Sequence, residues 1–130
     1  MATTTSDPRP VAGTAVRIRV HGDVLPAALR DNAASRSLLD QLPLSVTLAD
    51  YAGQEKVAEL PRPLSTAGMP PGDSAEPLDI GYYAPGDVLV LYYARVGYFR
   101  GITRIGTIDS SVEALRAIPD GSVATIEVAD

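Results

Sequence analysis

The stretch from Asp79 to Asp109 constrains the fold of this chain more than any other part of the sequence. It contains five of the six tyrosines and three apolar runs rich in β-branched and aromatic residues, at 80–83, 88–93 and 102–108. Breaks that contain Pro-Gly or Gly separate the runs, which is typical of strands joined by tight turns. We therefore expect these residues to form strands in the wall of a β-barrel.

Alternating apolar and polar residues predict further strands on both sides of this stretch. Val16, Ile18 and Val20 alternate with two arginines, so the first strand presents one apolar and one cationic face. The same reasoning places other strands at 24–29, 45–48, 56–60 and 123–128. Pro26 has no backbone N–H to donate, so it favours a sheet edge or a bulge for the second strand.

Two short helices are predicted between these strands. The first covers 33–42, has Asn32 as its N-cap, and buries Leu38, Leu39 and Leu42. The second opens at Ser110–Glu113, which has the S-x-x-E spacing of a capping box, and it buries Val112, Leu115 and Ile118. A proline follows each helix and ends it.

The segment 61–77 has an unusual composition. It reads PRPLSTAGMPPGDSAEP, with five prolines and two glycines, which no helix interior or central strand accepts. We expect a long loop here. Loops of this length in compact domains serve as lids or binding surfaces, or else are disordered, and both interpretations stay open.

About eight short strands and two short helices, joined mostly by turns, predict a mostly β fold. Such a set favours a closed, mostly antiparallel barrel with the helices capping its ends, because closure leaves no exposed sheet edge. Residues 1–13 offer little to bury and are expected to form a disordered tail. Residues 14–130 are then expected to be a single domain.

Composition narrows the classes of partner. With 16 acidic against 11 basic side chains, the net charge of −5 disfavours nucleic acid, whose binding needs clustered cations. The chain has no cysteine and one histidine, His21, so no metal site and no cofactor are expected. The sequence shows neither a secretory signal nor an apolar run long enough for a membrane span. A soluble, cytoplasmic protein is therefore expected.

Three groups of residues carry a family pattern. Two of them resemble parts of cyclophilins. The FGxV strand and the helix after it are similar to RIGTI at 104–108 and the apolar stripe that follows, and the short helix after the first hairpin is similar to 31–42. The segments DYAGQEKVAELP, IGYYAP and LVLYYARVGYFRGITRIGTID resemble bacterial cyclophilin-like proteins of unassigned function. This second resemblance extends from Ala15 to the C-terminus, and it implies a cyclophilin-like barrel.

The residues with which cyclophilins isomerise prolyl bonds are not recognisable here. The resemblance implies an arginine in an F-x-R motif, supported by Gln, Phe, His and often Trp. In this chain the only Phe, Phe99, directly precedes Arg100, and His21 lies in the first hairpin turn. We therefore expect a binding module for a small molecule or a short peptide rather than an enzyme. The alternatives are a weak or divergent prolyl isomerase and a protein interaction module that uses the 61–77 loop.

Tyrosines and arginines supply the expected binding surface. Neighbours in a strand point to opposite faces, so one tyrosine of each pair, Tyr82–Tyr83 and Tyr92–Tyr93, faces the core and the other solvent or a groove. A tyrosine offers an apolar ring with a polar tip, and the planar fork of arginine suits a carboxylate or phosphate. The expected ligand-binding residues are Tyr51, Glu55, Arg62, Tyr82, Tyr83, Tyr98, Arg100 and Arg104.

Overall fold

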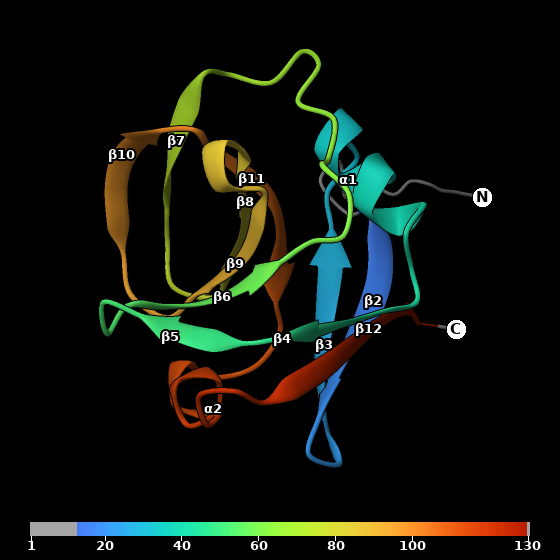
Figure 1. The fold of residues 1–130 in the computed structure, drawn as a ribbon, viewed down its shortest axis with the longest axis vertical. Coiled ribbons are helices and arrows are strands. Elements are labelled where there is room, and N and C mark those ends of the chain that lie inside the picture. Colours follow the sequence, from blue (N-terminus) through green and yellow to red (C-terminus); the bar gives the residue numbers. More distant parts are fainter. Residues whose placement is uncertain (1–12, 130) are drawn as a thin grey trace, which may run out of the picture.

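The computed structural model describes residues 13–129, which form β-strands, two α-helices and one 3-10 turn (Figure 1). The strands are β2 (Thr14–Val20), β3 (Asp23–Leu29), β4 (Leu44–Thr47), β5 (Ala49–Tyr51), β6 (Glu55–Glu59), β7 (Gly72–Ala75), β8 (Asp79–Tyr83), β9 (Val88–Tyr92), β10 (Val96–Arg100), β11 (Ile102–Ile108) and β12 (Val123–Val128). The helices are α1 (Ala33–Leu39), η1 (Ala84–Gly86) and α2 (Val112–Arg116). Almost all of the predicted tail, 1–13, lies outside the described residues.

Nine of these strands form one antiparallel sheet in the order β4-β12-β2-β3-β11-β8-β9-β6-β5. The two outermost strands, β4 and β5, are consecutive in the chain and separated only by Leu48. The Leu48 N–H donates to the Ser122 carbonyl over 2.8 Å, and its own carbonyl accepts from Gly121 N–H over 2.7 Å. The sheet therefore curls into a nearly closed barrel, which confirms the expected mostly β, barrel-shaped fold.

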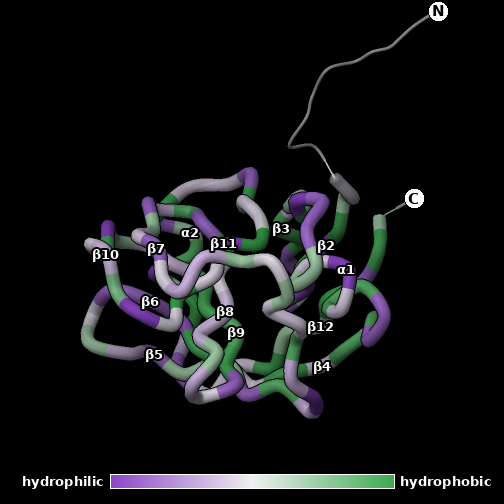
Figure 2. Tube along the Cα trace, turned by 90° about the horizontal axis from the view of Figure 1, so that it is seen from above, coloured by the Kyte–Doolittle hydropathy of each residue, from purple (hydrophilic) through white to green (hydrophobic). Residues whose placement is uncertain are grey.

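The interior of the barrel is apolar because alternate residues of each strand point inward. Val16, Ile18 and Val20 of β2 are buried, as predicted, while Arg17 and Arg19 lie outside and pair with Glu127 of β12. Figure 2 shows β9, whose sequence is VLVLY, as a hydrophobic segment in the middle of the trace. The two α-helices lie at opposite ends of the molecule (Figure 1).

Both helices form near their predicted positions, with two corrections. Asn32 caps α1, since the Ser35 N–H donates to its Oδ1 over 2.9 Å, but the helix ends at Leu39 instead of 42. The N-cap of α2 is Ser111 and not Ser110, because Ser111 is extended and its Oγ accepts from Ala114 N–H over 3.0 Å. Glu113 is then one position too early to complete a capping box.

Pro26 lies at a local sheet edge, as expected, and not at a bulge, because β11 pairs only with 27–29 and the β2–β3 register is continuous. Strand β3 lies inside the sheet, paired along its length with β2 and over its last residues with β11. Pro26 stands where β11 ends, and its carbonyl still accepts from Asp109 N–H over 2.7 Å. The N–H of a strand residue points to the same side as its carbonyl, and the β11 ladder has ended on that side, so the sheet tolerates proline at this position.

The 61–77 segment is not loop throughout, because Gly72–Ala75 forms β7. This strand pairs with β10 as a separate two-stranded ribbon, with Ala75 opposite Val96 and Gly72 opposite Arg100. A Cβ on Gly72 would lie 2.7 Å from the Phe99 carbonyl oxygen, so glycine permits the close approach of the two strands. The ribbon stands over the outer face of the sheet and builds a second apolar cluster there.

Candidate functional site

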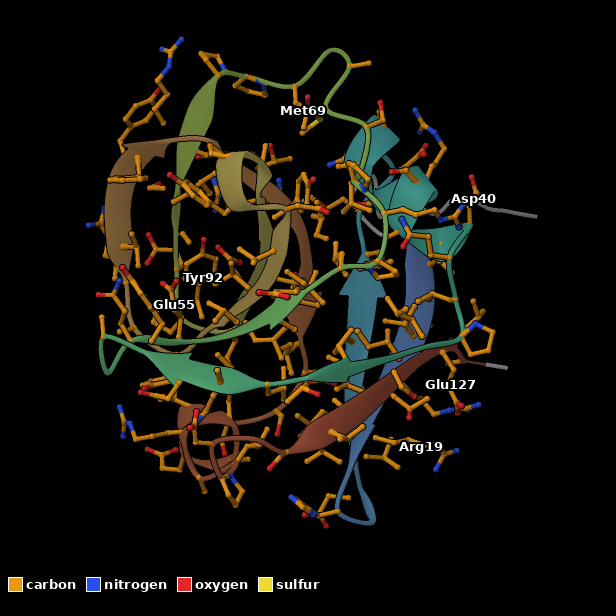
Figure 3. The ribbon with its side chains drawn as sticks, in the orientation of Figure 1. Arg19, Asp40, Glu55, Met69, Tyr92 and Glu127 are labelled. Carbon is orange, nitrogen blue, oxygen red and sulfur yellow. The ribbon has the colours of Figure 1, made fainter. Side chains whose placement is uncertain are left out.

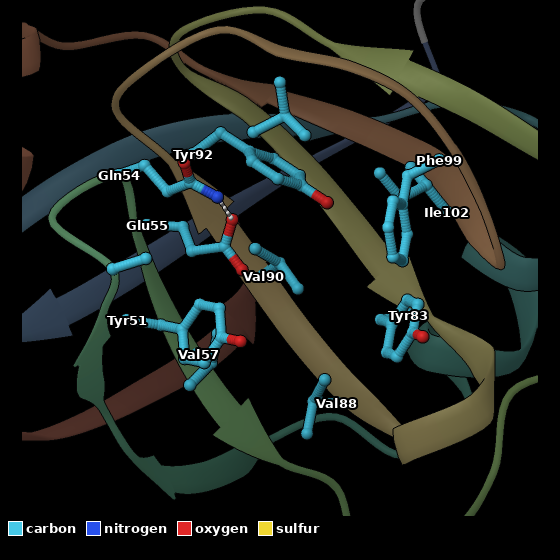
Figure 4. A pocket seen from close by; sticks show the side chains of 12 residues that line it. Tyr51, Gln54, Glu55, Val57, Tyr83, Val88, Val90, Tyr92, Phe99 and Ile102 are labelled. Carbon is cyan, nitrogen blue, oxygen red and sulfur yellow. Dashed lines mark hydrogen bonds between the residues drawn. The ribbon is translucent and has the colours of Figure 1, made fainter.

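A cavity of about 590 Å³ lies between the outer face of the sheet and the β7–β10 ribbon (Figure 4). Its lining comes from the β5–β6 turn, from β6, β8 and β9, and from β10 and the start of β11. The lining residues are Tyr51, Ala52, Gln54, Glu55, Val57, Tyr83, Val88, Val90, Tyr92, Val96, Phe99 and Ile102. The side chains are mostly apolar or aromatic, which is the usual character of a small-molecule site.

Strand register explains the floor of the cavity. In the β6–β9 pair, Val57 lies directly opposite Val90, and Glu55 lies directly opposite Tyr92. Because residues opposite one another share a face, the two valines make an apolar centre and the Glu55–Tyr92 pair makes a polar end. The intervening residues point into the barrel, where Leu89 and Leu91 are part of the main core.

The polar end carries a carboxylate that the protein leaves largely free. Gln54 Nε2 donates to Glu55 Oε1 over 3.3 Å, and within residues 13–129 the second oxygen has no hydrogen-bond partner. Burial raises the pKa of Glu55 above its usual value, and the negative charge of Asp50 adds to this. Figure 3 shows Glu55 and Tyr92 side by side, away from the Arg19–Glu127 pair.

Tyr92 lies on the wall of the cavity, with its side chain 2% exposed. Burial, with the charges of Glu55 and Asp79, raises the pKa of its phenol, so the hydroxyl stays protonated at neutral pH. A Cβ on Gly81 of β8 would lie 2.8 Å from Tyr92 Cε2 and 3.2 Å from its hydroxyl oxygen. Gly81 therefore provides the space in which the Tyr92 ring lies.

Aromatic rings form the rim. Tyr83 and Phe99 have ring centroids 5.9 Å apart at 44°, and Tyr51 stands on the other side (Figure 4). Tyr51 and Phe99 are 59% and 54% exposed. Gly101 has φ +104°, and a Cβ there would lie 2.9 Å from Tyr83 Cε1, so the turn from β10 to β11 fits closely against this ring.

The expected ligand-binding residues do not all meet at this cavity. Tyr51, Glu55 and Tyr83 line it, whereas Tyr82 lies in the barrel core, Tyr98 is exposed on β10, and Arg62 belongs to the loop beside α1. Arg100 is exposed and is not part of the lining, and Arg104 is held by Asp73 and Asp79 at 3.4 and 3.3 Å. The three arginines therefore do not converge into a clamp.

The tyrosine pairs divide as expected between core and outer face. Tyr82 and Tyr93 belong to the main core, and Tyr83 and Tyr92 belong to the cluster beneath the ribbon. Sequence reasoning nevertheless missed Tyr92 as a site residue, together with Gln54, Phe99 and the valines. The alternation shows that one member of each pair faces outward, but it does not show which one.

Lys56 lies behind the cavity floor, on the opposite face of β6 from Glu55. Its Nζ is buried, donates to the Ile118 carbonyl over 2.7 Å and pairs with Asp50 at 3.3 Å. Asp50 also accepts from the Tyr93 hydroxyl over 2.5 Å, and this bond, followed by Lys56, lowers the pKa of Asp50. Glu59 is exposed at the end of β6 and does not line the cavity. Asp50 lies behind the cavity floor with Lys56 and Tyr93, so Asp50, Glu55 and Glu59 do not form a carboxylate cluster.

Comparisons with known proteins agree with this architecture. The sequence profile described as the cyclophilin-like family matches residues 18–127. The solution structure of a hypothetical protein from Archaeoglobus fulgidus superposes with a TM-score of 0.66 at 20% identity, covering 95% of this chain and 100% of that one. No curated protein matches the chain. Among the described residues, no helix has the length and apolar character to cross a membrane. The chain belongs to the cyclophilin-like family.

Proposed function

We propose that this cyclophilin-like domain binds a small, mostly apolar molecule, or an apolar side chain of a short peptide, in the cavity beneath the β7–β10 ribbon, and that it does not turn the ligand over. The observation that carries the proposal is the cavity itself. Its volume of about 590 Å³ falls within the range of small-molecule sites, and few of its lining groups are polar.

Two features of the lining support binding. Apolar contact with Val57, Val88 and Val90 supplies a hydrophobic contribution of about 25 cal/mol for each Å² removed from water. The rim rings of Tyr51, Tyr83 and Phe99 add large contact areas that lose few rotamers on binding. Gly81 and Gly101 fit against the rings of Tyr92 and Tyr83, so these walls are formed before the ligand arrives.

The polar lining favours recognition over isomerisation. In cyclophilins, the donor aimed at the twisting prolyl amide is a positively charged arginine. The described lining offers Glu55, the Gln54 amide and tyrosine hydroxyls, and contains no guanidinium. These groups orient a ligand by hydrogen bonds, so binding without turnover is the function that the site supports best.

An amide-resolved NMR titration with 2-phenylethanol, a neutral aromatic probe, tests this proposal. We expect saturable shift changes in β6, β9 and β10. Val57→Phe places a ring on the half-buried cavity floor and should abolish them. Val123→Phe adds the same volume at a side chain that is 58% exposed on β12, and should leave them unchanged.

Two outcomes would contradict the proposal. Binding that survives Val57→Phe would place the ligand elsewhere, and the absence of any shift change at millimolar probe would reject the cavity as a binding site. In a parallel sample with an Ala-Pro peptide, enhanced cis/trans exchange that Val57→Phe abolishes would favour a divergent isomerase instead.

A further inference from the structure

The polar end of the cavity has a single formal charge among its described lining residues, the Glu55 carboxylate. The other polar side chains there are the Gln54 amide and the phenols of Tyr51, Tyr83 and Tyr92. Glu55 accepts one long hydrogen bond, from Gln54 over 3.3 Å. A half-buried carboxylate in a mostly apolar cavity gains from a donor, and most from a cationic one.

The cations near the cavity are engaged elsewhere or point away from it. Lys56 follows Glu55 in the chain but points into the barrel, where its Nζ donates to the Ile118 carbonyl. Arg104 pairs with Asp73 and Asp79, and Arg95 pairs with Glu76 at 3.2 Å. Arg100 lies on β10 but does not line the cavity. Glu55 therefore has no cationic partner of its own within the described residues.

Aromatic rings surround the space next to this carboxylate. Figure 4 shows Glu55 between Tyr51 and Tyr92, with Tyr83 and Phe99 across the cavity. The face of an aromatic ring attracts a cation, and the attraction grows when water is excluded. A carboxylate beside several rings is thus complementary to a positive charge attached to an apolar body.

We propose that the cavity selects a protonated organic amine, whose ammonium group binds between Glu55 and Tyr92 while its apolar part contacts Val57, Val90 and Phe99. This inference rests on the proposed function, because it specifies the ligand class of the same cavity. An ammonium donates to the free Glu55 oxygen and to the Tyr92 hydroxyl oxygen. A ligand carboxylate at this position would meet Glu55 without a compensating cation.

In the free protein, the Glu55 carboxylate lacks a positively charged partner among the described residues. Burial raises the pKa of Glu55, because the charged form loses hydration and no cation of the described residues compensates for that loss. A bound ammonium supplies the missing charge. The chain as a whole carries a net charge of −5, which also raises the local concentration of cations over that of anions.

Three probes of similar size and different charge test the inference: 2-phenylethylamine, 2-phenylethanol and phenylacetate, titrated at pH 7 and followed by amide NMR. We expect the amine to bind at least about tenfold more tightly than the alcohol, since charge-assisted hydrogen bonds are roughly twice as strong as neutral ones. Phenylacetate should bind most weakly. The same amide signals in β6, β9 and β10 should respond to each probe.

Two matched variants test whether Glu55 causes the preference for the amine over the alcohol. Glu55→Gln should remove the preference, so that the variant binds the amine no more than about twofold more tightly than the alcohol. Glu59→Gln removes the same charge from the same face of the same strand, at an exposed position outside the lining, and should keep the full preference.

The outcomes separate this inference from the proposed function. Equal affinity of the wild type for amine and alcohol would overturn the amine preference and leave the binding function in place. A preference that persists in Glu55→Gln, or that Glu59→Gln also removes, would overturn the assignment to Glu55. Failure of all three probes to bind would reject both proposals.

Discussion

The hydroxyl of Tyr82 connects β8 to two other segments of the chain, and its removal should lower the free energy of unfolding. It donates to Asp87 Oδ1 over 2.8 Å, just after η1, and it accepts from the buried Leu64 N–H over 3.2 Å. The side chain is 2% exposed. Tyr82→Phe deletes both bonds and leaves the Leu64 N–H without a partner among the described residues.

The expected loss follows from these two bonds. Each hydrogen bond contributes about 0.5 to 1.5 kcal/mol, and a buried donor left unpaired costs about 1 to 3 kcal/mol. Asp87 is only half-buried and recovers its bond from water, so we expect Tyr82→Phe to lower the free energy of unfolding by about 2 to 3 kcal/mol.

Urea unfolding followed by far-UV circular dichroism measures this loss. The matched control is Tyr98→Phe, which removes the same atom from a β10 side chain that is 65% exposed and should change stability by less than about 0.5 kcal/mol. An unchanged slope with urea would show that the denatured state is the same. A Tyr82→Phe loss as small as that of the control would refute the reasoning, since water would then satisfy the Leu64 N–H.

Two further substitutions test the cavity wall and the outer face of the barrel. Gly81→Ala should displace the Tyr92 ring and cost about 1 to 3 kcal/mol in urea unfolding, while Gly97→Ala, with no atom within 4 Å of its Cβ, should not. Hydrogen bonds from Arg19 and Arg17 lower the pKa of Glu127, so its stabilisation is present above the ordinary value of 4.5 and lost as pH falls through the lowered value. Glu127→Gln should therefore melt below the wild type at pH 7 and close to it at low pH, and a gap that is independent of pH would contradict this.

Much of the barrel could be predicted because its strands carry strong local signals. Branched and aromatic residues mark 80–83, 88–93 and 102–108, and each becomes a strand of the main sheet. Strand β10, which reads VGYFR, was not among the predicted strands, and β7 was missed because Gly72–Ala75 reads GDSA and favours no strand by itself. Pairing with β10 and the packing of Ala75 on Val90 and Tyr92 form this strand, and neither contact is visible in a local window.

The candidate site depends on the same missing information. Glu55 and Tyr51 could be selected because a charge and a tyrosine near a turn stand out in the sequence. Val57 and Val90 look like ordinary core residues, since strands that are apolar on both faces do not reveal which face is covered by a ribbon. Arg104 drew attention as an anion ligand, but its guanidinium joins β11 to β7 and β8 through Asp73 and Asp79.

The position of β12 between β2 and β4 has a consequence for how the chain folds during synthesis. Arg17 of β2 bonds to Glu127 of β12 across 110 residues of sequence. A growing chain that has not yet released 123–128 from the ribosome keeps the edges of β2 and β4 unpaired, and its barrel stays open. Such distant pairing is slow to form, and open strand edges bind other chains. The earlier strands can therefore associate with other chains until residues 123–128 emerge and pair with β2 and β4.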